Sequence, residues 1–302
     1  MSHYLFAHFI GEKKNGEQVY FSVSEDGLHW KDLNKGLPVL CSNIGESGVR
    51  DPFIVKNKNT GIYYLIATDL CIHDNPDWKA AVEQGSSDLI IWESSDLINW
   101  SDEWSCNVRI PGAGCAWAPE AIYDEKEKAL FVFWATWRSS EGKHRIYGAY
   151  TEDFRSISKP ELYIEREKGV IDTTIVKSGD YYYRFTKDED SARIIYERGK
   201  SLKGEFVEIP NTPLANMKGL EGPECYPFQD GRWCLVCDQF AAKKGYLPII
   251  INDLETGAME FLKESDYNLG QTRKRHGGII EISEDEYQQL LRHYGLLEGV
   301  VK

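Results

Sequence analysis

The sequence has few of the features that mark membrane or nucleic-acid-binding proteins. Its longest apolar runs, such as residues 89–92 and 247–251, are far shorter than the roughly 18 residues that a membrane-spanning helix needs. Basic residues are outnumbered, with 35 Lys and Arg against 48 Asp and Glu, which gives a net charge of −13. Because an acidic surface repels phosphate groups, we expect no nucleic-acid partner and no membrane partner.

The sequence offers little support for disulfide bonds or for a leader segment. The seven cysteines are an odd number, and the first residues, MSHYLFAHFIGEKK, lack a charged start followed by an apolar stretch. Cys234 and Cys237 form a CxxC motif, but no second pair supplies the further ligands that zinc needs. The sequence therefore predicts a cytoplasmic protein, or one whose secretion signal has been removed, with reduced, buried thiols.

Methionine is scarce, with three residues, whereas aromatic residues make up 13% of the chain and favour strands. The strands recur in two interleaved patterns. One pattern is a strand followed by a polar turn, as in Val19–Val23 before Ser24–Trp30 and Leu89–Glu93 before Ser94–Trp100. Similar segments are residues 146–150, 194–197 and 248–252. The pattern thus occurs five times.

The second pattern is a hairpin with glycine, asparagine or charged residues in its turn. It opens at Asp51, Ala118, Asp172 and Glu221, with a partial fifth copy at Arg275. Two hairpins make a four-stranded sheet, and four to eight such sheets around a central channel make a β-propeller. The sequence therefore predicts an all-β protein whose residues 1–302 form a single domain, a five-bladed β-propeller.

The two ends of the chain have defined places in this arrangement. The N-terminal strands, within residues 4–23, would complete the last blade and close the ring. Residues 283–293 predict the one clear helix, because Ser283 suits the N-cap position and acidic residues follow in the first turn.

Three carboxylates lie at the axial ends of predicted innermost strands, at what the repeat indicates is the same position in three blades. They are Asp51, Asp172 and Glu221. Collecting like charges in one pocket costs free energy unless protons or cations are shared. Functional sites tolerate that cost more often than purely structural sites do, so we expect a catalytic pocket on the axis.

Five short motifs occur in an order that resembles glycoside hydrolase family 43, and the resemblance covers nearly the whole chain. The motifs are Arg50-Asp51-Pro52, Trp117-Ala118-Pro119, Ile171-Asp172, Glu221-Gly222-Pro223 and Arg275-His276-Gly277. Members of that family are five-bladed propellers that act on arabinose- and xylose-containing glycans. The resemblance implies that Asp51 is the general base, that Glu221 is the general acid, and that Asp172 orients the acid and tunes its proton affinity.

These roles agree with the chemistry of an inverting hydrolase. Such enzymes need two carboxyl groups roughly 6.5–9.5 Å apart, and opposite sides of a propeller axis provide that separation. Glu224 competes with Glu221 for the acid role. Strict alternation along a strand would point Glu224 to the other face, which favours Glu221.

The resemblance also implies other contributors to the site. His276 is a candidate ligand, mainly through water, for a structural Ca²⁺ at the axis, because calcium prefers oxygen ligands; its alternative is a buried histidine that supports the pocket floor. No cofactor is required. Trp117 and Trp78 are candidates for sugar stacking, with packing as the alternative. Arg273 and Arg275 are candidates for binding sugar hydroxyls, and Arg275 is equally suited to pairing with Asp51 or Glu221.

Two other functions remain open at this point. A fructan-acting, retaining propeller hydrolase shares the Arg-Asp-Pro and Glu224-Cys225 elements, but nothing before Asp51 resembles the nucleophile segment of those enzymes. A non-catalytic carbohydrate-binding propeller has no need of three axial acids. We expect an exo-acting α-L-arabinofuranosidase or β-xylosidase that acts on oligosaccharides derived from hemicellulose or arabinan.

Overall fold

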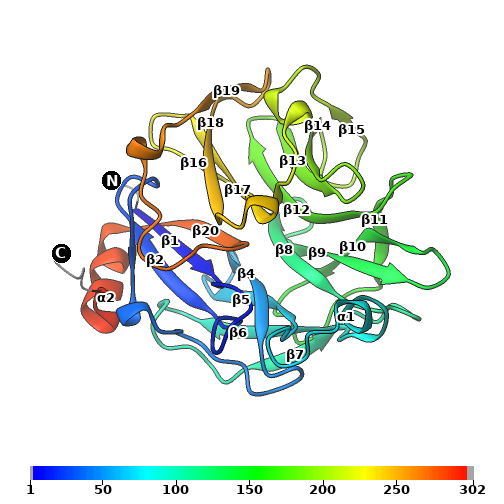
Figure 1. The fold of residues 1–302 in the computed structure, drawn as a ribbon, viewed down its shortest axis with the longest axis horizontal. Helices are drawn as coiled ribbons and strands as arrows, with labels where there is room; N and C mark the ends of the chain where they lie inside the picture. Colours follow the sequence, from blue (N-terminus) through cyan, green and yellow to red (C-terminus); the bar gives the residue numbers. More distant parts are fainter. Residues whose placement is uncertain (1–2, 298–302) are drawn as a thin grey trace.

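Five four-stranded antiparallel sheets surround a central axis in the computed structural model, which describes residues 3–297 (Figure 1). The first complete blade is β4 (Val49–Lys56), β5 (Tyr63–Asp69), β6 (Asp88–Ser94) and β7 (Trp104–Asn107). The second is β8 (Trp117–Asp124), β9 (Ala129–Arg138), β10 (Lys143–Thr151) and β11 (Glu161–Ile164). The third is β12 (Val170–Ser178), β13 (Tyr181–Asp188), β14 (Arg193–Gly199) and β15 (Phe206–Glu208). The fourth is β16 (Glu221–Pro227), β17 (Trp233–Asp238), β18 (Tyr246–Asp253) and β19 (Ala258–Phe261).

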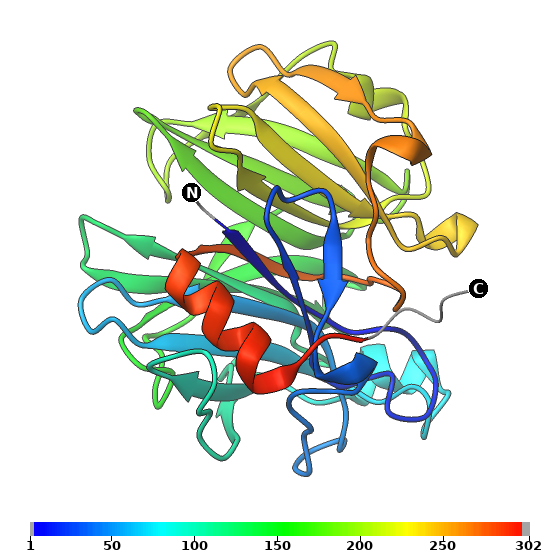
Figure 2. The ribbon, with the colours of Figure 1, turned by 90° about the vertical axis from the view of Figure 1, so that its left-hand side faces the viewer.

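The fifth blade joins the two ends of the chain. Its order is β20 (Gly277–Ile282), β1 (His3–His8), β2 (Tyr20–Ser24) and β3 (Trp30–Asp32). β1 pairs with β20 on one side and with β2 on the other, and Figure 2 shows the blue N-terminal strands on the same side of the molecule as the red helix that follows β20. This confirms the predicted closure of the ring.

Within the described residues 3–297, two α-helices lie outside the blades. α2 (Glu284–Tyr294) begins after Ser283, whose hydroxyl accepts a hydrogen bond from the backbone N–H of Glu286, as the sequence predicts. α1 (Trp78–Gln84) was not predicted, because the sequence indicated one clear helix, within residues 283–293. The helix has seven residues and buries only Ala81, which leaves too short a hydrophobic pattern to detect. No helix among residues 3–297 is long and apolar enough to cross a membrane.

The hydrophobic core lies between neighbouring blades. Between the first and second blades, for example, Ile66 and Ile91 pack in one cluster with Val132 and Trp134. The cysteines at 71, 106, 115, 225, 234 and 237 are buried and free, and Cys41 is exposed and free. These layers hold the innermost strands in fixed positions around the axis.

A buried ion pair anchors the segment that leads into β20. The Asp32 carboxylate, on β3, accepts hydrogen bonds from the backbone N–H groups of Gln271 and Thr272 and contacts the Lys274 ammonium. Burial opposes the charge, but Lys274 and the hydrogen bonds lower the pKa of Asp32 to about 2. The segment held in this way continues directly into Arg275 and His276.

We expect Asp32→Asn to destabilise the protein by about 3–5 kcal/mol, because the variant leaves the buried Lys274 ammonium without its anion. Urea unfolding measures the change. Asp102→Asn, which alters an exposed aspartate, is the control and is expected to have little effect. Equal stabilities of the two variants would contradict this role of Asp32.

Candidate active site

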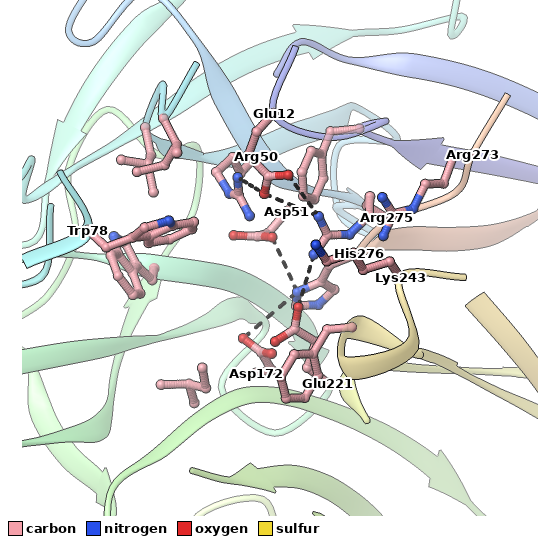
Figure 3. A pocket seen from close by; sticks show the side chains of 16 residues that line it. Glu12, Arg50, Asp51, Trp78, Asp172, Glu221, Lys243, Arg273, Arg275 and His276 are labelled. Atoms are coloured by element: carbon pink, nitrogen blue, oxygen red, sulfur yellow. Dashed lines mark hydrogen bonds and ion pairs between the residues drawn. The ribbon is translucent and has the colours of Figure 1, made fainter. Parts of the chain in front are cut away.

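A cavity of about 550 Å³ opens on the axis where the innermost strands begin (Figure 3). All the residues that the sequence analysis selected lie in its wall: Asp51, Trp78, Trp117, Asp172, Glu221, Arg273, Arg275 and His276. Phe9, Glu12, Arg50, Phe240 and Lys243 also contribute to it. Its volume lies within the range typical of small-molecule sites.

Backbone bulges place the acids at the mouth of the axis. Asp51, Ala118, Asp172 and Gly222 all have φ between 47° and 52°, in the left-handed region, and the strand pairing shifts register at each of them. The freed backbone N–H groups then reach the preceding blade. Gly222 donates to Asp172 Oδ2 (2.9 Å), and Ala118 donates to Thr68 Oγ1 (2.8 Å), which in turn donates to Asp51 Oδ2 (2.9 Å).

The bulges correct one prediction. Glu221 is not at the same place in the repeat as Asp51 and Asp172, because Gly222 occupies the bulge position of the fourth blade. Glu221 instead precedes the bulge, as Arg50, Trp117 and Ile171 do in their blades. A Cβ at Gly222 would lie 2.7 Å from His276 Cγ, so glycine lets the histidine approach the strand.

His276 lies between the acids on the pocket floor. Its Nδ1 is 3.5 Å from Asp51 Oδ1 and 3.9 Å from Asp172 Oδ1, and its Nε2 is 3.8 Å from Glu120 Oε1. Burial opposes protonation, but the interactions with these carboxylates raise the pKa of His276 well above its usual value. The histidine thereby supplies a cation that offsets the clustered negative charge.

Asp51, which is partly buried, and Asp172, which is buried, differ in their ionisation. Burial raises the pKa of each, but His276, Arg50 and the Thr68 hydroxyl lower the pKa of Asp51 below its ordinary value. For Asp172 burial prevails, helped by the charges of Glu221 and Asp51, and its pKa is raised. Opposite shifts in one pocket are typical of acid–base sites.

Two cations hold the Glu221 carboxylate. Lys187 Nζ is 2.8 Å from Glu221 Oε2, and Arg275 Nη2 is 3.1 Å from Glu221 Oε1. Arg275 also contacts the buried Asp238 through Nε, so its guanidinium is fixed in place. Of the two partners expected for Arg275, Asp51 and Glu221, the structure pairs it with Glu221.

Glu12 joins the two arginines of the pocket. Its Oε1 is 2.8 Å from Arg50 Nη1 and 3.2 Å from Arg275 Nη1. Partial burial opposes ionisation, but Arg50 and Arg275 lower the pKa of Glu12 to about 2. The connection between β1 and β2 therefore closes one side of the pocket with a charged carboxylate.

A second acidic layer lies beneath the pocket and includes Glu224. Glu224 Oε2 accepts a hydrogen bond from Thr174 Oγ1 (3.2 Å), and Oε1 accepts one from the backbone N–H of Ile279 (2.9 Å). Burial raises the pKa of Glu224 well above its ordinary value and that of Glu120 to about 7. The bulge at Gly222 interrupts the strict alternation expected between Glu221 and Glu224. Glu221 and Glu224 therefore differ in depth rather than in the strand face they occupy. Glu221 lines the pocket, whereas Glu224 does not.

The environment of His276 does not suit direct metal binding. Both of its nitrogens face carboxylates, and a protonated imidazole has no lone pair for a metal. Among residues 3–297, no group of three or more His, Cys, Asp or Glu side chains is arranged to hold a metal ion. We therefore assign no catalytic step to Ca²⁺.

The two tryptophans form one corner of the pocket. Their rings meet edge to face with centroids 6.3 Å apart, and Trp117 stacks on His144 at 5.3 Å. Trp78 is 46% exposed, and the Arg50 guanidinium lies 5.1 Å from its ring centroid. Each ring therefore packs against another side chain of the protein, and both rings also line the cavity.

Sequence reasoning missed Lys187, Glu12, Phe240 and Lys243. Lys187 lies on β13, paired in register with Ile171. The sequence did contain a signal for Lys187, because it lies in a hydrophobic strand that follows the Asp172 motif. A lysine is seldom buried without an acid partner, so an acidic neighbour could have been expected. No signal identified Glu12, whose contact with Arg275 spans 263 positions.

Comparisons with known proteins agree with this geometry. A family model described as a probable glycosyl hydrolase domain, related to family 43, matches residues 1–288. An α-L-arabinofuranosidase of Bifidobacterium longum subsp. longum is 29% identical over an alignment 290 residues long, with coverage of 79% of this chain and 27% of that protein. The chain thus spans about a quarter of the length of this relative.

Solved structures share the fold. The α-L-arabinanase of Cellvibrio cellulosa has a TM-score of 0.60 at 14% identity, covering 89% of this chain and 95% of that one. An exo-β-1,3-galactanase of Clostridium thermocellum also has a TM-score of 0.60, at 15% identity, covering 91% and 62%. A bifunctional protein of Bacteroides eggerthii has a TM-score of 0.57 at 15% identity, covering 91% of this chain and 35% of that one. With the family match over residues 1–288, the chain belongs to the glycosyl hydrolase domains related to glycoside hydrolase family 43.

Proposed function

We propose that this protein is an inverting, exo-acting glycoside hydrolase that releases arabinose, or alternatively xylose, from the ends of oligosaccharides. The observation that carries the proposal is the convergence of Asp51, Asp172 and Glu221 in one axial pocket with opposite pKa shifts on the two aspartates. The arabinofuranosidase relative favours arabinose over xylose. The β1–β2 connection with Glu12, and α1 with Trp78, border the pocket on two sides, which favours the end of a glycan chain over its middle.

The proposed reaction is a single displacement. Asp51 accepts a proton from a water molecule as the water oxygen attacks the anomeric carbon. The bond from that carbon to the glycosidic oxygen breaks, and Glu221 donates a proton to the departing oxygen. The lowered pKa of Asp51 keeps the base ionised. Asp172 lies next to the bulge that follows Glu221 and holds the acid through the Gly222 N–H group.

A panel of nitrophenyl glycosides tests the sugar, and proton NMR of the first product tests the stereochemistry. We expect turnover of the α-L-arabinofuranoside and a first product of inverted configuration. Retention would instead support the fructan-type mechanism, in which the carboxyl groups are about 5–5.5 Å apart. No turnover of any glycoside would support a carbohydrate-binding propeller.

Asp172→Asn is expected to move the alkaline limb of the pH–rate profile to lower pH. Burial and electrostatic repulsion from Glu221 and Asp51 raise the pKa of Asp172, and the substitution removes this titratable neighbour of the acid. The profile of kcat/KM on an arabino- or xylo-oligosaccharide measures this change. Asp190→Asn, an exposed residue with its side chain outside the axial pocket, is the control. An unchanged alkaline limb in Asp172→Asn would exclude the tuning role.

A further inference from the structure

Two cations at the mouth of the pocket are left without an acid partner. They are Lys243, which is exposed, and Arg273, which is half-buried. Among residues 3–297, neither has an ion pair within 4 Å, and the buried Nε of Arg273 has no hydrogen-bond partner. The chain as a whole carries a net charge of −13, so unpaired cations in a pocket wall stand out.

The other charges on this side of the pocket are already satisfied. Glu221 contacts Lys187 and Arg275, and the buried Asp238 contacts Arg275. Glu12 is shared by Arg50 and Arg275. Arg273 acts electrostatically on Asp238, but beyond ion-pair distance. The free positive potential at the mouth therefore comes from Lys243 and Arg273.

The backbone brings these two cations together. Lys243 follows the short helix η3 (Phe240–Ala242), and its own φ is 56°, in the left-handed region. Gly245 then packs against the segment before β20: a Cβ there would lie 3.3 Å from Arg273 Cγ. The Tyr246 N–H donates to the Lys274 carbonyl (3.2 Å), which joins the two segments.

The position of the pair relates it to the leaving group. In Figure 3, Lys243 and Arg273 lie on the side of Arg275, away from Trp78, with Asp51 between the two sides. Lys243 belongs to the same blade as Glu221. The Lys187 ammonium, which contacts Glu221, lies 4.6 Å from the centroid of the Phe240 ring. In the proposed reaction the acid protonates the departing oxygen, so the leaving-group sugar lies on the acid's side.

We propose that the leaving-group subsite recognises a carboxylate, so that the preferred substrate carries its arabinose or xylose on a uronic acid. A guanidinium matches the planar geometry of a carboxylate, and an exposed ammonium adds a second positive charge. Phe240, which also lines this part of the cavity, offers an apolar surface to the sugar ring. This inference rests on the proposed function of the same site.

The test compares matched disaccharides in which the released sugar is linked either to glucuronic acid or to its methyl ester. We expect kcat/KM of the wild type to be about tenfold or more higher for the free acid, since a hydrogen bond to a charged group is worth about that factor. Lys243→Gln and Arg273→Gln should each lower this acid-to-ester ratio, and the double variant should bring it close to one. Lys244→Gln, which removes a neighbouring exposed lysine outside the pocket, should leave the ratio unchanged.

Ionic strength and direct binding give independent measurements. Raising the salt concentration to about 1 M, where the Debye length is about 3 Å, should reduce the ratio. Titration calorimetry should show tighter binding of glucuronic acid than of its methyl ester, and this readout requires no hydrolysis. Equal binding, or an equal ratio in the wild type and the double variant, would overturn the carboxylate subsite. If the enzyme hydrolyses nitrophenyl arabinoside but shows no preference for the free acid over the methyl ester among the disaccharides, the carboxylate subsite is overturned and the proposed function stands.

Discussion

Replacing Asp51 by asparagine is expected to lower kcat by about 10²–10⁴-fold, the range typical for loss of a general base. The amide keeps the size of the side chain and can still accept the hydrogen bond from Thr68, but it cannot take a proton from water. The loss should be similar for natural oligosaccharides and for activated aryl glycosides, because attack by water is required for both. Steady-state kinetics on the two substrate classes measures this.

Folding must be intact for this result to bear on mechanism. Asp51 is partly buried and faces His276, so thermal unfolding of the variant should be recorded alongside its kinetics. Asp190→Asn, in an exposed turn, supplies the reference for a neutral substitution. A folded Asp51→Asn protein with near wild-type turnover would exclude Asp51 as the base.

Glu221→Gln is expected to produce a loss that depends on the leaving group. Natural glycosides depart as poorly stabilised alkoxides and need a proton, so their turnover should fall by about 10²–10⁴-fold. Dinitrophenyl glycosides depart with little protonation and should lose far less. Comparing kcat/KM for an arabino- or xylo-oligosaccharide with that for a dinitrophenyl glycoside measures the difference.

Glu224 and Asp172 are the two other acids with which the leaving-group dependence of Glu221→Gln is compared. Glu224→Gln alters a carboxyl group that lies beneath the pocket and is hydrogen-bonded to Thr174, so we expect no leaving-group dependence there. Because Glu221→Gln also deprives Lys187 and Arg275 of a partner, its thermal stability should be measured too. Leaving-group dependence in Asp172→Asn or Glu224→Gln, with equal losses on both substrates in Glu221→Gln, would assign the acid elsewhere.

Much of the architecture is readable from the sequence because it follows from local patterns. Each third strand, such as β6 or β10, is a short hydrophobic run before a polar turn, and five copies predict five blades. The closure through β1 follows from the incomplete repeats at the two ends of the chain, which supply three strands and one strand to the fifth blade. The motifs around Asp51, Asp172 and Glu221 predicted one shared pocket, because propeller geometry brings the starts of innermost strands to the axis.

The details of the site depend on tertiary contacts that no local pattern encodes. The bulge at Gly222 shifts Glu221 out of register with Asp51 and Asp172, and it places Glu224 beneath the pocket. Lys187 approaches Glu221 only because two neighbouring blades pack side by side.

The charges of the pocket also depend on tertiary contacts. Glu12 meets Arg275 only after the ring has closed, 263 positions apart in the chain. A side chain's ionisation depends on which charges lie within a few ångströms and on how far water is excluded. The blade repeat therefore follows from hydrophobic alternation and turn residues, whereas the balance of charge around Asp51, Asp172 and Glu221 exists only in the folded propeller.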